Sequence, residues 1–503
     1  MIRITNRMMY NNTLVNAFRN NQGLLAAQEQ ISSGKRINRP SDDPTGMMEV
    51  LEFRSSIGKS ERYIRVMDNA ESFLNTADST IGSVHDQLKS AKEQALSQAG
   101  GMANAQTRKT SATLIDTMIE QMISTGNTRI GSRYIFAGQR SELPAIDSNG
   151  NYVGSGKDLR AEITSDVVIP ISVRASEFLT ADMNPAVSTS TTIASLNGGA
   201  GVTAGNFNIT DRAGNTGAVT ISLGDTISDV ITAVTAAGTN ITASVSSDGT
   251  ALVLTDSTSS PLAPIIVQSN STSQGLGLDG TRNTSTFTGD ALDPDIVSAT
   301  LIADLYAGDG VTLNDIVLMN GGASSTVSFT GDTTVGDMIT SINTIGGAMS
   351  DTVAATIDST GRKLTITSGN ANTVAFAKEA GSGNTAELLG IGGGRNVIPI
   401  LQKFSAALKA NDNNGIQAAL GLLDTNMDTV NSVRGSIGAR ANQVINIRSS
   451  ETEAALNNTK LKSFIEDADY IEAASELAML QTAYQATLKS SAAIIQTSLL
   501  NFL

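Results

Sequence analysis

Apolar residues recur at alternating intervals of four and three positions in the first third of the chain. The pattern is unbroken over these positions: Tyr63, Met67, Ala70, Leu74, Ala77, Ile81, Val84, Leu88, Ala91 and Ala95. Residues three and four apart share one face of a helix, so the pattern predicts a long helix with a coiled-coil seam. No proline lies between Pro44 and Pro144 to interrupt it,. A second window, 114–123, places Ile115, Ile119 and Met122 on one helical face.

The C-terminal part of the chain repeats this pattern after Pro399, the last proline. One stripe, interrupted only by Arg434, comprises Ile416, Leu420, Leu423, Met427, Val430, Ile437, Ala441 and Val444. A later stripe comprises Ala473, Leu477, Leu480, Tyr484, Leu488, Ile495, Leu499 and Phe502. An apolar seam is unstable alone in water, so we expect the two ends of the chain to pack together as a rod.

Large apolar residues near the N-terminus are candidates for this pairing. Leu14, Phe18 and Leu25 are spaced four and seven apart, and Leu488, Ile495 and Leu499 are spaced seven and four apart. Each set shares one helical face. We therefore predict an assembly interface formed by Leu14, Phe18, Leu25, Leu477, Tyr484, Leu488, Ile495 and Leu499.

Residues 144–398 differ from both ends because Gly, Ser, Thr and Asn dominate there. The run 167–173 reads as a strand, Asn149-Gly150 as a hairpin turn, and 188–192 as a Ser/Thr linker. Two segments within this region resemble each other in the same order: 219–232 matches 327–340, 248–255 matches 360–367, and 276–278 matches 389–391. We infer two copies of one small module, roughly 193–280 and 300–393, each with strands, one short helix opened by Asp-Thr, and a closing hairpin.

The predicted fold class is therefore α+β: a long helical coiled-coil rod built from both chain ends, with an inserted β-rich region containing two repeated small modules. The start of the first rod helix is marked by Ser41, Asp42, Asp43 and Pro44, which combine a capping carboxylate with a proline at the first helical position,.

Charge and composition exclude several functions. Between residues 190 and 400 there are 18 acidic and 6 basic side chains, which argues against nucleic-acid binding,. The absence of cysteine rules out disulfides and thiolate chemistry, and a single histidine rules out a His-Glu-x-x-His peptidase site,. We find no catalytic constellation, and we expect no enzyme activity, no cofactor, no metal and no membrane insertion. The first twenty residues lack the apolar core of a secretory signal, so we expect any export to use another route.

Motifs at both ends resemble the flagellin superfamily of bacterial flagellar axial proteins. The segment 31–44, ISSGKRINRPSDDP, is similar to the link between the terminal helix and the first rod helix of flagellins. The segment 465–470, IEDADY, contains Glu466, Asp467, Asp469 and Tyr470 and is similar to a flagellin motif near the C-terminus. The segment 131–138, which contains Tyr134, Ile135, Phe136, Ala137 and Gly138, resembles the hook–filament junction branch of the superfamily.

This resemblance implies a structural protein that joins the hook to the flagellin filament by self-assembly into the axial tube. Implied partners are further copies of the chain (in a ring or short helical zone), the first hook-associated protein, flagellin, and the flagellar export apparatus with its chaperone. The implied location is the extracellular flagellum, reached without a cleaved signal peptide. The alternatives are a flagellin that forms the filament itself, or a flagellar surface protein whose inserts act as an adhesin.

We accordingly expect five parts. They are the terminal helices 1–40 and 465–503 as an inner coiled-coil domain, 41–143 with 399–464 as a helical rod, 144–192 as a β-rich outer domain, 193–298 as the first module, and 299–398 as the second.

Overall fold

The computed structural model describes residues 6–100, 103–183, 185–247, 249–258 and 263–500, and the side chains of residues 6–7, 9–10 and 493–500 are outside the description. The described part combines long helices toward both ends with a β-rich region between them, as the sequence predicts. The chain divides into two compact units. Unit 1 comprises Met1–Asn69, Glu162–Val168 and Gln443–Leu503, and unit 2 comprises Ala70–Ala161 and Ile169–Asn442.

The heptad patterns correspond to long helices. They are α1 (Asn6–Ser33), α2 (Pro44–Ala99), α9 (Asn413–Glu466) and α10 (Tyr470–Leu500), with the shorter α3 (Ala105–Gly126) and α8 (Val397–Ala410) in unit 2. The predicted start of the first rod helix is confirmed: α2 begins at Pro44, and Asp43 Oδ1 accepts a hydrogen bond from the Gly46 backbone N–H at 2.9 Å. The helices α2 and α9 contribute residues to both units.

In unit 2 the seam of the rod lies where the sequence places it. The α2 positions from Ala70 to Ala95 are at most 2% exposed, and Ile416, Val430 and Ile437 of α9 are at most 1% exposed. Two ion pairs, Lys92–Asp424 and Asp78–Arg434, join α2 to α9, and the residue number rises along one helix as it falls along the other. The helices are therefore antiparallel, and the Arg434 interruption of the stripe is an ion pair.

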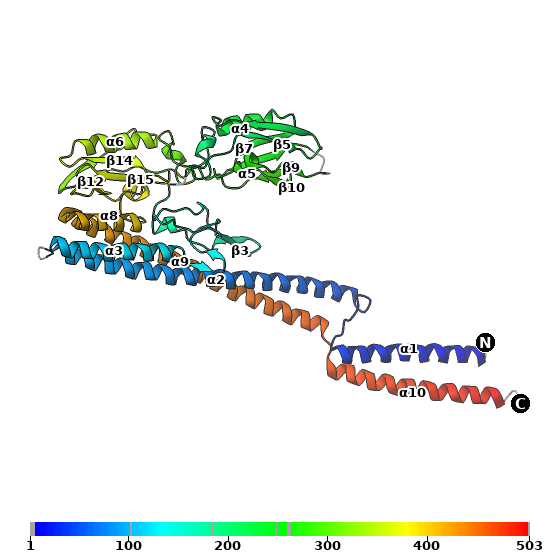
Figure 1. Cartoon of the computed structure of the whole chain (residues 1–503). Helices are drawn as coiled ribbons and strands as arrows, with labels where there is room; N and C mark the ends of the chain where they lie inside the picture. Colours follow the sequence, from blue (N-terminus) through cyan, green and yellow to red (C-terminus); the bar gives the residue numbers. More distant parts are fainter. Residues whose placement is uncertain (1–5, 101–102, 184, 248, 259–262, 501–503) are drawn as a thin grey trace. The chain divides into compact units, whose positions relative to one another are not determined.

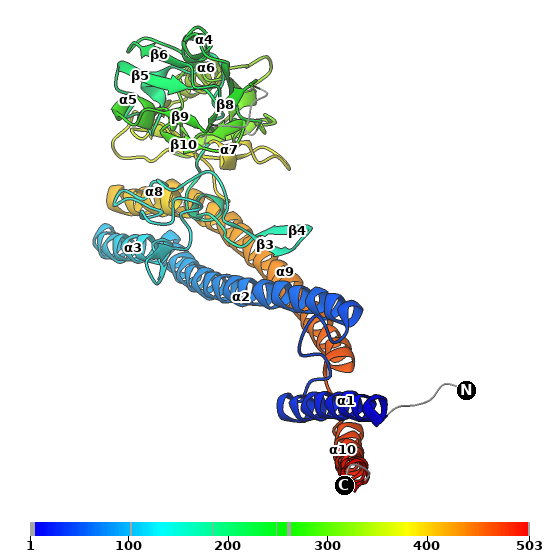
Figure 2. The same cartoon turned by 90° about the vertical axis from the view of Figure 1, so that its right-hand side faces the viewer.

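The helices α3 and α8 lie side by side in unit 2 (Figures 1 and 2). Ile115 and Met122 are fully buried, as their spacing predicts. At the polar edge of this contact, Asp116 accepts hydrogen bonds from Ser405 at 2.5 Å and pairs with Lys409 at 2.7 Å. Two contacts to one carboxylate fix the alignment of α3 on α8.

Residues 127–192, which we call the outer segment, follow α3. Its elements are the hairpin β1 (Arg129–Ile130) with β2 (Arg133–Tyr134), the pair β3 (Arg160–Thr164) with β4 (Val167–Pro170), and the 3-10 turn η1 (Ala175–Glu177). The strand predicted over 167–173 is shorter than expected and ends at Pro170, which lacks a backbone N–H,. The Asn149-Gly150 turn is confirmed, with Gly150 at φ 87° and Asp147 N–H bonded to Asn151 O, although only an isolated bridge flanks it.

The two modules share the same order of elements, except that module 1 ends with two additional strands, β10 and β11. In module 1 these are η2 (Ile193–Ser195), β5 (Gly205–Thr210), β6 (Thr216–Ile221), α4 (Ile227–Thr235), β7 (Ile241–Val245), β8 (Leu252–Asp256), β9 (Ile265–Val267), α5 (Ser271–Gly275), β10 (Gly280–Arg282) and β11 (Thr286–Thr288). In module 2 they are η3 (Ile302–Asp304), β12 (Ile316–Asn320), β13 (Ala323–Val327), α6 (Val335–Gly347), β14 (Val353–Ile357), β15 (Leu364–Ser368), β16 (Phe376–Glu379) and α7 (Thr385–Leu388).

The correspondence confirms the internal repeat. Strand order β9-β5-β6 in module 1 matches β16-β12-β13 in module 2, and hairpin β7-β8 matches β14-β15. Helices α4 and α6 begin with the same capping box: Thr226 caps with Asp229, and Thr334 caps with Asp337,. Asp248, part of one matched segment, lies outside the described residues. Each module has its own apolar core.

Candidate assembly interface

The two motifs that resemble flagellins touch each other in unit 1. The Ala468 N–H donates to Gly34 O at 3.0 Å, and the Arg36 N–H donates to Glu466 O at 2.7 Å. Lys35 and Asp467 form an antiparallel bridge. The loop between α1 and α2 is therefore joined by its backbone to the loop between α9 and α10. The sequence contains both motifs but no signal that they contact each other.

Glu466 is the buried charge at this contact, and only 1% of its side chain is exposed. Its Oε1 lies 2.6 Å from Lys35 Nζ and 2.5 Å from Arg54 Nη2. Burial alone would raise the pKa of Glu466, but the hydrogen bonds from Lys35 and Arg54 outweigh it and hold the pKa below its usual value,. The carboxylate thus fixes the end of α9 to the first turns of α2 and to the α1–α2 loop.

Two other acids of the motifs, Asp42 and Asp469, cap backbone groups, whereas the Asp467 carboxylate accepts a hydrogen bond from the Ser463 hydroxyl. Asp42 Oδ2 accepts from the N–H groups of Asn38 and Arg39 at 3.1 and 2.8 Å. Asp469 Oδ1 accepts from Ile471 N–H at 2.9 Å and so begins α10,. Ser41 and Asp467 are exposed. Tyr470 is 59% exposed, yet a Cβ atom at Gly34 would lie 2.7 Å from its hydroxyl oxygen. Gly34, at φ 72°, thus makes room for the tyrosine,.

The helices α1 and α10 lie side by side and antiparallel in unit 1 (Figure 1). Asn20 Nδ2 donates to Thr487 Oγ1 at 3.0 Å, and a Cβ at Gly23 would lie 3.3 Å from Leu480. The least exposed positions repeat every four and three residues: Thr13, Ala17, Asn20, Leu24, Ala27 and Ile31 on α1, and Ala473, Leu477, Leu480, Tyr484, Thr487 and Ser491 on α10. Small residues such as Ala27 allow the backbones to approach closely.

Only part of the predicted interface lies in this seam. Leu477 and Tyr484 are half-buried in it, whereas Leu14, Phe18, Leu25 and Leu488 are 39%, 66%, 58% and 47% exposed. The expectation that Leu14, Phe18 and Leu25 pack against Leu488 within one chain is therefore corrected, because α1 meets α10 with a different face, the one that bears Ala17, Leu24 and Ala27. The side chains of Ile495 and Leu499 lie outside the described residues. A role of the exposed residues in contacts between copies stays a prediction.

The segment 134–138 is part of the core of the outer segment. Ile135, Phe136 and Ala137 are at most 1% exposed, and the rings of Phe136 and Phe178 pack edge to face at 5.1 Å,. Tyr134 lies beneath the guanidinium of Arg129 at 4.9 Å from the ring centre. Gly138 has φ 64°, and a Cβ there would lie 2.4 Å from Lys157 O. This motif therefore organises packing at the end of α3.

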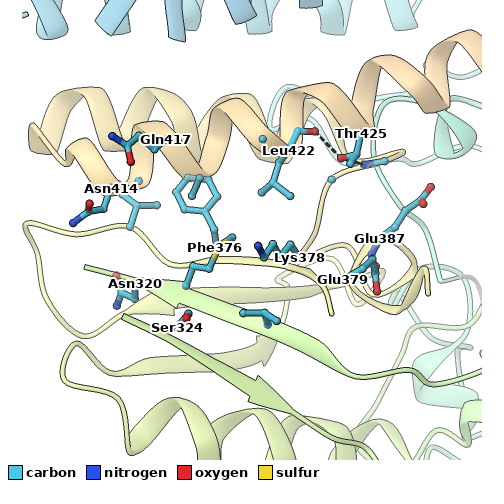
Figure 3. A pocket seen from close by; sticks show the side chains of 18 of the residues that line it. Asn320, Ser324, Phe376, Lys378, Glu379, Glu387, Asn414, Gln417, Leu422 and Thr425 are labelled. Carbon is cyan, nitrogen blue, oxygen red and sulfur yellow. Dashed lines mark hydrogen bonds between the residues drawn. The ribbon is translucent and has the colours of Figure 1, made fainter. Parts of the chain in front are cut away.

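A groove of about 900 Å³ lies between the sheet of module 2 and α9 (Figure 3). Two of its charged residues are engaged in packing: Glu379 accepts a hydrogen bond from the Glu387 N–H at 3.0 Å, and Glu387 pairs with Arg395 at 3.2 Å. Burial raises the pKa of Glu379 despite its backbone hydrogen bonds.

Within the described residues, no group of three His, Asp or Glu side chains is placed to hold a metal ion. Among these same residues, no helix is both long and apolar enough to cross a bilayer.

The N-terminal helical part of the chain matches a known protein family. Residues 4–141 match the family model described as the bacterial flagellin N-terminal helical region. This part of the chain, which includes α1, α2 and α3, is therefore similar to the N-terminal helical region of flagellins.

Individual relatives narrow the resemblance. The chain is 26% identical over 164 residues to flagellar hook-associated protein 3 of Escherichia coli, and 25% identical over 166 residues to that of Salmonella typhimurium. These alignments cover 32% and 33% of the chain and 52% of each relative, so the chain spans about half the length of the relatives it matches. A match to flagellin of Listeria monocytogenes is 26% identical and covers 22% of the chain and 38% of that protein. The predicted resemblance to the hook–filament junction branch of the flagellin superfamily is confirmed.

Solved structures of the same kind also match. The structure of flagellar hook associated protein-3 from Legionella pneumophila covers 82% of the chain and 98% of its own length, with 13% identity and a TM-score of 0.36. That of FlgL from Xanthomonas campestris covers 82% and 99%, with 14% identity and a TM-score of 0.36.

Proposed function

We propose that the chain is a structural component of the bacterial flagellum that joins the hook to the flagellin filament by self-assembly into the axial tube. One observation carries the proposal: the two chain ends pair through α1 and α10, yet the paired helices leave Leu14, Phe18, Leu25 and Leu488 exposed. A soluble single chain gains nothing from such side chains, whereas a neighbouring copy can cover them.

The free energy available from this covering supports assembly. Full burial of a leucine or phenylalanine side chain is worth about 1.5–3 kcal/mol, and each copy contributes several such side chains on α1 and α10. Because one face of each helix is already used in the α1–α10 seam, contacts between copies would use the remaining apolar positions. The structure is thus compatible with many copies placed side by side around a tube.

The partners we propose are further copies of the chain in a ring or short helical zone, the first hook-associated protein and flagellin. We also propose the flagellar export apparatus and its chaperone as transient partners, and the extracellular flagellum as the location. The chain would be structural rather than catalytic. The division of its helices into an inner coiled-coil domain and a surrounding rod domain is part of the same proposal.

The test replaces exposed residues of α1 and α10 and compares them with a seam residue. In a Phe18→Ala, Leu25→Ala, Leu488→Ala variant we expect an unchanged melting curve of the purified chain and loss of assembly, with flagellin and the variant secreted into the medium and bare hooks in electron micrographs. The matched control is Leu480→Ala in the seam, which should lower the stability of the α1–α10 pair by about 2–5 kcal/mol. Normal filaments on cells making the triple variant would contradict the proposal.

A flagellin role and a junction role predict different locations of the protein along the flagellum. A filament protein is present along the whole filament, whereas a junction protein is confined to one short zone at its base. Labelling with an antibody against module 1 should therefore mark only the hook end of each flagellum. Label along the filament would favour the flagellin alternative.

A further inference from the structure

Three connections between parts of unit 2 meet at one arginine. Arg362 lies in the turn between β14 and β15 of module 2 and is 5% exposed. Its backbone carbonyl accepts a hydrogen bond from Met183 N–H at 2.8 Å, at the end of the outer segment nearest module 1. The neighbouring Gly361 carbonyl accepts a hydrogen bond from Ile296 N–H at 2.7 Å, in the segment between β11 of module 1 and η3 of module 2. Arg362 thus stands where the outer segment and both modules come together.

The guanidinium of Arg362 binds carboxylates from two of these connections. Its Nη1 and Nη2 form a two-pronged pair with Asp293 at 2.9 and 2.7 Å, the strongest geometry for such a pair,. Nη1 also lies 3.6 Å from Asp182, and Nε lies 3.8 Å from Asp295. Asp293 in addition pairs with Arg140 of the outer segment at 3.4 Å. We call these five residues, Arg140, Asp182, Asp293, Asp295 and Arg362, the Arg362 cluster.

Module 1 contacts the Arg362 cluster through backbone groups. Asp295 N–H donates to Ser195 O at 2.7 Å, and Gly198 N–H donates to Asp293 O at 2.8 Å. A Cβ at Gly199 would lie 2.3 Å from the Asp295 carboxylate, so only glycine allows this approach. Asp293 itself has φ 45°, a conformation that a residue with a side chain rarely adopts,. Such a conformation persists only where the surroundings impose it.

The cluster is out of charge balance. Within it, three carboxylates face two guanidinium groups, and Asp182, Asp293 and Arg362 are at most 7% exposed. The neighbouring Asp358 and Lys363 act on Asp295 and Asp182, and because one is an acid and the other a base they leave this excess of one negative charge unchanged. Buried ion pairs contribute little net stability because desolvation offsets their attraction, but removing one partner leaves an uncompensated buried charge. Such an arrangement therefore favours one relative placement of the parts that it joins.

We infer that the Arg362 cluster is a charge lock that holds module 1, module 2 and the outer segment as one body, and that the lock loosens when all three carboxylates are ionised. With all three ionised the cluster carries a net negative charge inside the protein. When one carboxylate binds a proton, the two guanidinium groups balance the remaining two.

Asp295 is the carboxylate that binds this proton. Its pKa is raised to about 6: burial raises it most, Arg362 opposes the increase, and Asp293, Asp358 and Asp182 add to it. The part of module 1 next to Asp295 is backbone, namely that of Ser195 and Gly199. Because the pKa is higher in the locked state than in a solvated carboxyl, near 3.9, protonation stabilises the lock. That stabilisation is complete below about pH 3.9 and is lost as the pH rises through about 6. The open fraction should therefore rise about ten-fold between pH 5 and pH 8.

The test measures a distance between the modules in the full chain. The chain contains no cysteine, so spin labels can be placed at Leu223→Cys in module 1 and Thr330→Cys in module 2 without other changes. Pulsed electron–electron double resonance should give one narrow distance distribution at pH 5. A second population of distances should grow as the pH rises toward 8. Asp295→Asn should keep the narrow distribution at both pH values. Arg362→Met should give a broad distribution throughout.

The matched control is Arg282→Met, which removes an exposed module 1 arginine outside the cluster and should behave like the parent chain. Hydrogen exchange of β14 and β15 in Arg362→Met separates an open lock, in which these amides stay protected, from an unfolded module. If module 2 unfolds in Arg362→Met, the variant Arg362→Lys is used in its place. Lysine keeps the charge but not the two-pronged pair, so the lock should open partly at pH 8. A narrow, pH-independent distribution in the parent and in the folded arginine variant would overturn the inference.

Discussion

The carboxylate of Glu466 accepts a 2.5 Å hydrogen bond from the guanidinium of Arg54, although 412 positions separate the two residues along the chain. Glu466 belongs to the last turn of α9 and Arg54 to the third turn of α2, so this bond closes unit 1 across the antiparallel helices. Lys35 binds the same Oε1, which ties in the loop after α1. Replacing Glu466 therefore affects all three segments at once.

Glu466→Gln should lower the free energy of unfolding of unit 1 by about 1.5–3 kcal/mol, the usual value of a hydrogen bond to a charged group. Glutamine keeps the shape but leaves the three cations Lys35, Arg54 and Lys462 without this anion. Urea denaturation followed by circular dichroism measures the change. The matched control is Asp467→Asn, whose exposed carboxylate should matter by no more than about 0.5 kcal/mol,. Equal effects of the two changes would contradict the role given to Glu466.

Acid should loosen the same contact. The pKa of Glu466 is held below its ordinary value, so its ionised form stabilises the folded state. This stabilisation is present above the unfolded pKa, near 4.3, and is lost as the pH falls through the lower folded value. Protease cleavage in the loops 34–43 and 467–469 should accelerate as the pH falls below about 4. In Glu466→Gln the cleavage rate should already be high at pH 7 and should lack this acid step.

Gly138→Ala should destabilise the outer segment by about 2–4 kcal/mol, because the left-handed backbone penalises a side chain and the new Cβ would meet two carbonyl oxygens. Those oxygens, of Lys157 and Ser155, would lie 2.4 and 2.7 Å from it. Gly131 is the matched control: its φ is 61°, but a Cβ there would meet nothing within 4 Å. Gly131→Ala should cost only about 1–2 kcal/mol. Thermal melting of the two variants gives the comparison.

Deleting 195–393 and closing the chain with a short linker should leave the helical rod folded, because the buried heptad positions of α2 and α9 lie outside that stretch. The rod would lose contacts such as the hydrogen bond from Lys403 Nζ to Ala375 O, at 3.0 Å, which lie at its surface. We expect export and filament attachment to persist and the helical signal per remaining residue to rise. A stably exported deletion protein that fails to attach filaments would show that the modules take part in joining.

The sequence determined the features that depend on spacing along one helix or one module. The unbroken stripe from Met67 to Ala95 became the buried face of α2 because a regular helix allows no other placement of residues three and four apart,. The Asp43-Pro44 helix start and the duplicated modules followed from equally local rules. These features rest on short-range geometry, which the order of residues already contains.

Tertiary structure alone decided which faces and charges meet. On α1, Phe18 and Leu25 are as apolar as the residues of the seam, yet the face that meets α10 is the neighbouring one, which bears Leu24 and Ala27. On that face Gly23 lies against Leu480, where a Cβ would come within 3.3 Å of the leucine side chain. The same holds for Arg362 and Asp293, which lie 69 positions apart in a pair that no spacing indicates. A long-range contact is selected by the free energy of the whole packed arrangement, which one-dimensional periodicity does not contain.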